Sequence, residues 1–397
     1  MERWRWSLKW AVYILSVGTS IGLMSAIFLK SLDWVTELRN TNDWLIYLLP
    51  LVGLLIAFFY KQYGASVVRG NDLIFEEIQA ESKPIPLRMA PLVFFGTLLT
   101  HLVGGSAGRE GTAVQMGGAI ASKIAKIFRS TGPDRKLILI MGVSSGFASV
   151  FGTPFAGAFF ALEVVALKEK RILSFLPALL TALVAHVVCL SVGAKHSDYF
   201  VGNLPNFDRG IVKVILLVVI LGLVSGSISF CYMQLSKSAS GIFSKIKEPM
   251  LRPVIGGILL LIGYMTIVDS RFMGLGIDSI QQSFSVPSQP FDFLIKLLLT
   301  VLTLSSGFKG GEVTPLFFIG ASMGSALSLF LPLPLGMMAA IGFVAVFAGA
   351  TKTPIASTIM GMEIFGPQIG VYLCIACYLS YFVSGKGSIY DFKKAES

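Results

Sequence analysis

The chain has 397 residues, of which 54% are hydrophobic and 14% are charged, and its formal net charge is +10. Soluble domains carry about 25% charged residues, so this composition excludes an ordinary soluble protein and indicates a polytopic membrane protein. The positive balance is explained by short basic loops between membrane segments, and we expect no nucleic-acid partner.

Long runs without Asp, Glu, Lys or Arg are the candidate membrane segments, because a helix needs about 20 apolar residues to cross the hydrocarbon core. In chain order these runs are Trp10–Leu29, Met89–Ala107, Leu137–Leu162, Val313–Thr351 (interrupted by Pro332 and Pro334) and Phe365–Gly385. Together with shorter, interrupted apolar segments they predict about ten or more membrane helices, and therefore an all-α polytopic membrane protein.

Basic residues cluster in the short connecting segments, which predicts the orientation in the membrane. The clusters are Met1–Lys9, Lys123–Lys136, Lys168–Arg171, Lys237–Arg252 and Lys386–Lys394, whereas Gly193–Gly210 is nearly neutral. Cytoplasmic loops carry an excess of Lys and Arg. We therefore expect both termini in the cytoplasm and Gly193–Gly210 on the outer side.

An internal repeat divides the chain into two halves. The segments FASVFGTPFAGAFFALE and FAGATKTPIASTIMGME share a T-P-x-A core and a final acid, Glu163 in the first and Glu363 in the second, 200 residues apart. Repeats of this kind, with interrupted apolar segments at corresponding places, are typical of transporters. We expect a single transmembrane domain, 1–397, with repeats at about 40–192 and 211–390 and no cytoplasmic regulatory domain.

Four polar interruptions fall among the apolar segments: RGNDLIFEEIQ (Arg69–Gln79), GREGT (Gly108–Thr112), KGGEVTP (Lys309–Pro315) and Tyr390. The first three place glycine just before a helix-competent run. The free N–H groups and the positive dipole end of a helix start attract anions, so three converging starts would form an anion site. The alternative is a set of ordinary glycine turns, but an ionisable residue at membrane depth usually marks an ion pathway.

These segments resemble the CLC family of chloride channels and anion/proton antiporters. GREGT is similar to the family's G-R-E-G-P segment, GGEVTP to its G-x-F-x-P and GNDLI to its G-S-G-I-P, and the order of motifs agrees from Trp10 to Tyr390. The resemblance implies a CLC-type inverted repeat of interrupted, tilted membrane helices. It also implies a homodimer in the lipid membrane, with one pathway per subunit.

The resemblance assigns roles to matched positions. Glu110 corresponds to the gating glutamate, whose carboxylate competes with the anion and swings away when it is protonated. Tyr390 corresponds to the tyrosine whose hydroxyl closes the inner side of the pathway. Gly108, Arg109 and Gly111 correspond to the anion-binding backbone that starts the helix around Glu110.

Departures from the common chloride pattern resemble the fluoride-exporting branch of the family. Asn71 stands where a serine usually contacts chloride, Val313 where phenylalanine is common, and Val164 where chloride antiporters carry an internal proton-transfer glutamate. Thr314 and Asn71 offer donors to fluoride, which is small and strongly hydrated and needs close, strong donors in place of water. Glu312 is a candidate for proton coupling; the alternative is an acid paired with Lys309 at a helix start.

The predicted function is therefore fluoride export in exchange for protons across the bacterial plasma (inner) membrane. A chloride/proton antiporter or chloride channel of the same family is the first alternative. A remote alternative is an intramembrane serine hydrolase, because GVSSG (Gly142–Gly146) fits G-x-S-x-G and His101 could serve as a base; small residues for helix packing explain the motif better. We expect no enzyme activity, no cofactor and no metal, and we interpret Cys374 and Cys377 as small apolar residues.

Overall fold

The computed structural model describes residues 2–80, 84–165, 171–202, 210–267 and 269–390. Within these residues the chain forms sixteen α-helices and no β-strand, which confirms the predicted all-α fold. The basic cluster Lys168–Arg171 falls largely outside the described residues, as do residues 203–209 of Gly193–Gly210 and residues 391–394 of Lys386–Lys394.

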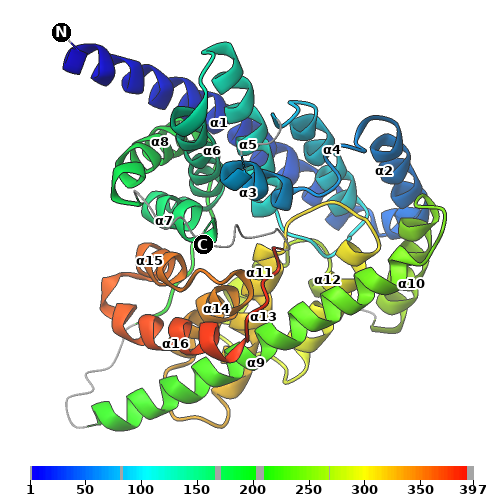
Figure 1. The fold of residues 1–397 in the computed structure, drawn as a ribbon. Helices are drawn as coiled ribbons and strands as arrows, with labels where there is room; N and C mark the ends of the chain where they lie inside the picture. The colour runs from blue at the N-terminus through cyan, green and yellow to red at the C-terminus, as the bar shows by residue number, and fades with distance from the viewer. Residues whose placement is uncertain (1, 81–83, 166–170, 203–209, 268, 391–397) are drawn as a thin grey trace.

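The helices of the first half are α1 (Glu2–Thr41), α2 (Leu49–Tyr63), α3 (Asn71–Ala80), α4 (Met89–Leu102), α5 (Glu110–Ile127), α6 (Gly132–Phe151), α7 (Pro154–Val164) and α8 (Arg171–Ser191). Those of the second half are α9 (Ile211–Ser244), α10 (Leu251–Ile267), α11 (Ile277–Gln282), α12 (Asp292–Ser305), α13 (Val313–Leu327), α14 (Leu335–Thr351), α15 (Pro354–Phe365) and α16 (Gly370–Val383). Figure 1 shows α1–α8 grouped together and α13–α16 grouped opposite them, with α9 along the outer side of the second group.

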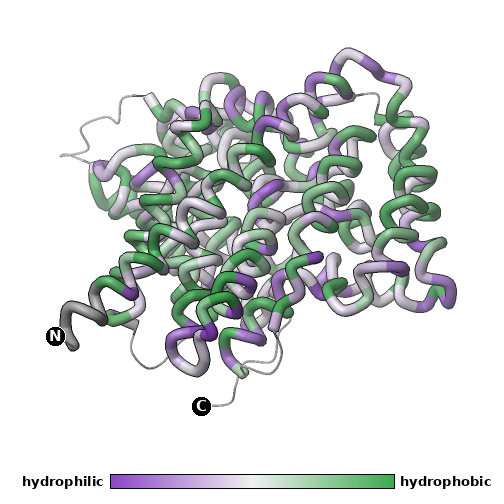
Figure 2. The backbone as a smooth tube through the Cα atoms, turned by 90° about the horizontal axis from the view of Figure 1, so that it is seen from above, coloured by the Kyte–Doolittle hydropathy of each residue, from purple (hydrophilic) through white to green (hydrophobic). Residues whose placement is uncertain are grey.

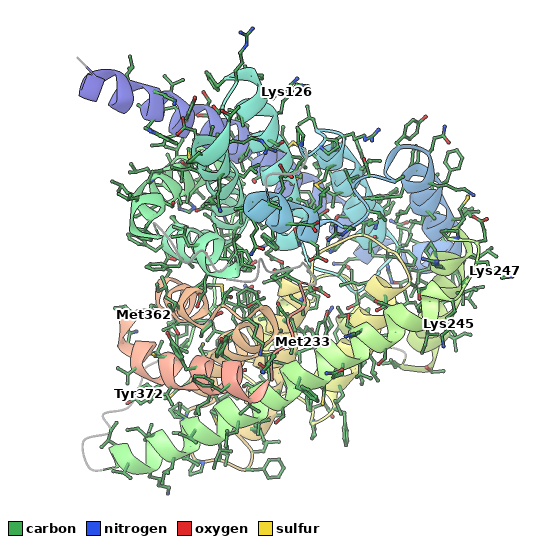
Figure 3. The ribbon with its side chains drawn as sticks, in the orientation of Figure 1. Lys126, Met233, Lys245, Lys247, Met362 and Tyr372 are labelled. Atoms are coloured by element: carbon green, nitrogen blue, oxygen red, sulfur yellow. The ribbon has the colours of Figure 1, made fainter. Side chains whose placement is uncertain are left out.

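Four helical segments in the described residues are long and apolar enough to cross a membrane: Leu8–Thr41, Asp43–Tyr63, Leu173–Ser191 and Ile211–Ser244. Most other apolar helices are only 10–17 residues long. Figure 2 shows hydrophobic residues along the helices and the hydrophilic ones mainly where helices end. In Figure 3, Lys126 near the end of α5 and Lys245 and Lys247 just after α9 lie at the periphery of the molecule.

The uncharged run Leu137–Leu162 is divided between two helices rather than forming one. Gly152 ends α6 with a left-handed φ of +80°, a conformation that glycine adopts without strain, and Pro154 begins α7. Pro154 suits this first helical position, because proline has no N–H to leave unpaired there. The run Val313–Thr351 is divided at its prolines into α13 and α14, as predicted.

The two copies of the T-P-x-A segment form an antiparallel helix pair, α7 and α15, held by reciprocal caps. The Glu163 carboxylate at the end of α7 accepts hydrogen bonds from Ile355 N (3.1 Å) and Ala356 N (2.8 Å) at the start of α15. Glu363 at the end of α15 accepts matching bonds from Phe155 N (3.0 Å) and Ala156 N (2.7 Å). Corresponding helices therefore run in opposite directions, as an inverted repeat requires.

Candidate functional site

The breaks before α5 and α13 are joined directly, which brings two helix starts to one point. Gly108 N donates to Gly311 O (2.6 Å) and Gly311 N donates to Gly108 O (2.7 Å), forming a short antiparallel bridge. A Cβ on Gly311 would lie 2.7 Å from the backbone nitrogen of Gly111, closer than real Cβ atoms come. Only glycine allows the two breaks to approach this closely.

The Glu110 carboxylate is seated between these two helix starts. It accepts hydrogen bonds from Arg109 N (3.1 Å), from Thr314 N (3.1 Å) and from the Thr314 hydroxyl, whose Oγ1 lies 2.6 and 2.7 Å from its two oxygens. Glu110 is only 1% exposed. A carboxylate therefore occupies the place toward which the free N–H groups of a helix start and a hydroxyl point, which is the chemistry of an anion site.

A cavity of about 190 Å³, here called the Asn71 cavity, lies beside this carboxylate. Among its lining residues are Asn71, Gly111, Val313, Glu312 and Tyr390. The starts of α3, α5 and α13, which are separate in the sequence, thus contribute to one small chamber. Gly111 and Val313 directly adjoin Glu110 and Thr314 along the chain, so the chamber and the seated carboxylate belong to one site.

Asn71 begins α3 and lines the cavity. Its Oδ1 atom is buried and has no hydrogen-bond partner. The preceding Gly70 has a φ of +58°, in the left-handed region, and a Cβ on Gly111 would lie 3.2 Å from Asn71 Nδ2. The Oδ1 atom is an acceptor, so its lack of a protein partner indicates a place for a water or another donor.

Tyr390 lies in the wall between the Asn71 cavity and a larger one. It is 9% exposed and packs edge-on against Phe75, with ring centroids 5.0 Å apart, and against Phe160 at 6.3 Å. The larger cavity, here called the Lys237 cavity, has a volume of about 790 Å³ and runs along α9; Lys237 and Lys386 line it together with Tyr390. Tyr390 is thus positioned to separate the two spaces.

Glu312 is held by a tyrosine that sequence reasoning missed. The hydroxyl of Tyr232, a fully buried residue of α9, donates to Glu312 Oε1 at 3.3 Å. The alternative ion pair between Lys309 and Glu312 does not form in this described segment, because Lys309 Nζ lies over the ring of Tyr60, 4.1 Å from its centroid. A tyrosine within a long apolar helix gives no sequence signal of such a contact.

The backbone and the side chain of Arg109 contribute to different places. Its N–H binds the Glu110 carboxylate, whereas its side chain, 3.6 Å from Glu110 Oε1 at Nε, lines a separate cavity of about 730 Å³, here called the Arg39 cavity. At the end of α7, Val164 is buried and supplies no carboxylate. The Arg109 side chain therefore lines a different cavity from Asn71, although the Arg109 backbone binds Glu110.

The serine-hydrolase alternative is wrong on geometry. The Ser144 hydroxyl is fully buried and donates to Ala178 O at 3.1 Å. The two ring nitrogens of His101 lie 2.8 Å from Thr97 O and 3.0 Å from Ala107 O, so His101 binds backbone and does not activate Ser144. In the part of the chain that the structure describes, His, Cys, Asp and Glu side chains form no group of three that could hold a metal ion.

Comparisons with known proteins place the chain in a family. The family model described as voltage gated chloride channel matches residues 52–385. The chain is 44% identical over 389 residues to the chloride/fluoride channel protein of Pseudomonas syringae pv. tomato, covering 96% of this chain and 85% of that one. It is 27% identical to the H(+)/Cl(-) exchange transporter ClcA of Klebsiella pneumoniae, covering 93% and 85%. A crystal structure of a CLC-type fluoride/proton antiporter superposes with a TM-score of 0.92 at 36% identity, covering 97% of both chains.

Proposed function

The chain belongs to the voltage-gated chloride channel (CLC) family of integral membrane proteins, and we propose that it exports fluoride across a bacterial plasma membrane in exchange for protons. The family consists of channels and transporters, so the chain is not an enzyme. The similarity to a chloride/fluoride channel protein and to a fluoride/proton antiporter supports fluoride as the anion.

The observation that carries the proposal is the position of the Glu110 carboxylate. Two backbone N–H groups and the Thr314 hydroxyl surround it at 2.6–3.1 Å, so the ionised side chain takes the place of an anion. Protonation removes its charge and weakens these charge-assisted hydrogen bonds. The neutral side chain then moves away from these donors, and fluoride binds to them in its place.

Coupling follows because the proton and the anion act on one residue. Fluoride reaches the donors only after Glu110 has taken up a proton, and the proton is released when the ionised carboxylate returns. An inward proton gradient therefore drives fluoride outward. Glu312, at the start of α13 and hydrogen-bonded to Tyr232, is the second acid in this proposed coupling.

Asn71 and Thr314 provide the proposed selectivity. Fluoride gives up its hydration shell only to close, strong donors. Burying even a neutral polar group without a hydrogen-bond partner costs roughly 2–7 kcal/mol, and burying an unpaired ion costs more. The Asn71 amide has two N–H donors, a serine side chain has one O–H donor, and Thr314 adds a further hydroxyl. A chloride/proton antiporter is the remaining alternative, supported by the 27% identity to an H(+)/Cl(-) exchange transporter.

The proposed orientation places the Lys237 cavity in the cytoplasm and the Arg39 cavity outside. Lys237 and Lys386 come from basic clusters, whereas Lys195 and His196 of the Arg39 cavity come from the nearly neutral Gly193–Gly210 segment. Both termini are then cytoplasmic. We further propose a homodimer with one pathway per subunit, in which apolar side chains exposed on α8, such as Leu176 (58%), face a partner.

Flux measurements on Glu110→Gln test the proposal. A glutamine fills the same space but cannot ionise, so we expect fluoride movement to lose its dependence on a proton gradient. Fluoride and proton fluxes from the same proteoliposomes, followed by a fluoride electrode and a pH probe, report this directly. Fluoride efflux that stays coupled to protons in Glu110→Gln rules out the gating role.

A further inference from the structure

The Arg39 cavity is lined by two buried arginine side chains that the proposed exchange does not use. Arg39 and Arg109 both line it, and each is only 5% exposed. The Nε atom of each guanidinium is buried and has no hydrogen-bond partner. Buried charged donors are normally paired, because leaving them unpaired carries a large free-energy penalty.

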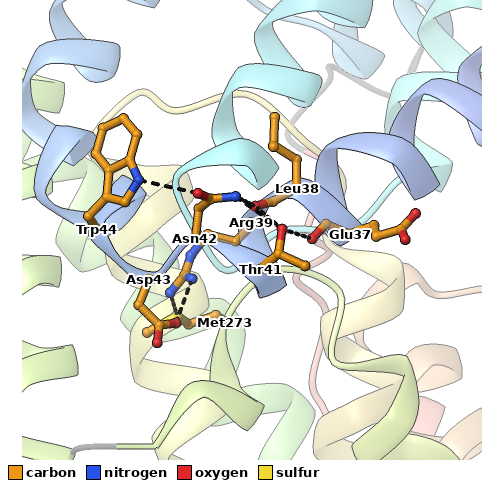
Figure 4. A network of polar contacts seen from close by, with 8 residues as sticks. All are labelled: Glu37, Leu38, Arg39, Thr41, Asn42, Asp43, Trp44 and Met273. Carbon is orange, nitrogen blue, oxygen red and sulfur yellow. Dashed lines mark hydrogen bonds and ion pairs between the residues drawn. The ribbon is translucent and has the colours of Figure 1, made fainter.

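Figure 4 shows the two side-chain contacts that Arg39 makes with the protein. One terminal nitrogen lies 3.3 Å from Asp43 Oδ1, and the other faces the sulfur of Met273 at 2.7 Å. The Asp43 side chain is 94% exposed, so water screens that pair, and a thioether sulfur is a weak acceptor. The charge of Arg39 is therefore poorly compensated by the protein.

Acidic residues of the same cavity are at its rim. Asp33, Glu37, Asp43 and Asp278 line it but are exposed to solvent. A third arginine, Arg271, is paired with Asp269 at 2.6 Å and with Asp292 at 3.1 Å. Exposed charges act through a high dielectric constant, whereas buried ones act through a lower one, so Arg39 and Arg109, which are buried and have ion-pair partners only at 3.3 and 3.6 Å, supply the buried positive charge of this cavity.

The Arg109 side chain lies close both to this cavity and to the Glu110 carboxylate. Its Nε lies 3.6 Å from Glu110 Oε1, too far for a hydrogen bond but close enough to feel the charge of the ionised carboxylate. When Glu110 becomes neutral, that nearby anionic charge is lost. Both guanidinium groups are then available to an anion that passes the gate.

We propose that Arg39 and Arg109 form a second anion-binding site, on the outer side of Glu110, for a small hard halide. This inference rests on the proposed function: the site receives fluoride after it leaves the donors around Glu110 and holds it until it escapes into solution. Charge-assisted N–H bonds from two guanidinium groups are its ligands.

External fluoride should compete for this site and slow efflux, which gives a measurable quantity. Right-side-out membrane vesicles containing the protein are loaded with fluoride, and the initial efflux rate is measured against increasing external fluoride. The medium contains inert salt at about 0.1 M, where screening over about 10 Å removes general attraction by surface charge. Loss of one charge-assisted contact in Arg39→Gln should raise the half-inhibiting concentration about tenfold.

Two further variants make the outcome decisive. Lys195→Gln removes an exposed cation from the rim of the same cavity and should shift the half-inhibiting concentration less than about twofold. Arg39→Lys keeps the charge but loses the planar fork, so an intermediate shift, about threefold, is expected; it also provides the test if Arg39→Gln does not reach the membrane. Equal shifts in the Arg39 variants and Lys195→Gln overturn the proposal.

The result is separable from the identity of the transported anion. If wild-type vesicles move chloride instead of fluoride, the proposed function fails, and the same comparison is made with external chloride. If wild-type vesicles export fluoride but Arg39→Gln and Lys195→Gln behave alike, the exchange stands and the second site is absent.

Discussion

Replacing Thr314 with valine should loosen the gate while keeping the side chain's shape. The hydroxyl is the closest donor to Glu110, with Oγ1 at 2.6 and 2.7 Å from the two carboxylate oxygens. The backbone bonds from Arg109 N and Thr314 N, both at 3.1 Å, remain. The substitution thus removes one charge-assisted contact from the seated, ionised carboxylate.

A hydrogen bond to a charged group contributes about 1.5–3 kcal/mol. Taking about 2 kcal/mol for the Thr314 hydroxyl, the ratio of seated to released Glu110 falls about 30-fold. Fluoride then passes a gate that opens without taking up a proton. Total flux falls because Thr314 is also a proposed fluoride donor, but the ratio of fluoride flux to proton flux rises.

The assay compares fluoride and proton fluxes in proteoliposomes for three variants. Thr314→Ser keeps the hydroxyl and should keep the wild-type flux ratio. Thr97→Val is the matched control, because it removes a fully buried hydroxyl that lies 2.7 Å from Thr112 Oγ1. A wild-type flux ratio in Thr314→Val, or an equal rise in Thr97→Val, refutes the role of the hydroxyl in seating Glu110.

Two other changes test selectivity and the repeat. Asn71→Ser replaces two N–H donors with one O–H donor and should lower the fluoride-to-chloride flux ratio about tenfold; an unchanged ratio excludes Asn71 from selectivity. Glu363→Ala leaves the N–H groups of Phe155 and Ala156 without their acceptor and should lower the thermal unfolding temperature in detergent by a few degrees, roughly the effect of losing about 1–3 kcal/mol. Glu163→Ala should have a similar effect, and a loss in only one of the two variants contradicts the reciprocal capping.

The helix starts of the site were predictable from the sequence because each has its own local signal. Glu110 and Glu312 lie beside glycines, next to long uncharged runs. A charged residue with glycine neighbours is easy to recognise in such a sequence. The T-P-x-A repeat likewise predicted that Glu163 and Glu363 occupy corresponding positions. Their roles as caps for each other's helices were not predicted, because the contact depends on how α7 and α15 pack.

Contacts made through tertiary packing had no local signal. Tyr232 lies in an apolar helix, and nothing in the neighbouring sequence indicates that its hydroxyl reaches Glu312. Arg39 is near the end of α1 and far in sequence from Arg109, yet both line one cavity. The proximity of Lys309 to Glu312 in sequence suggested an ion pair, but Lys309 extends over Tyr60 instead.

The most direct measurement is the flux of fluoride and of chloride through the wild-type protein in proteoliposomes, with and without a proton gradient. Fluoride–proton exchange predicts that an inward proton gradient drives fluoride out against its own gradient, that fluoride export carries protons inward, and that chloride moves far more slowly. Chloride movement as fast as that of fluoride, or fluoride efflux that carries no protons, contradicts it.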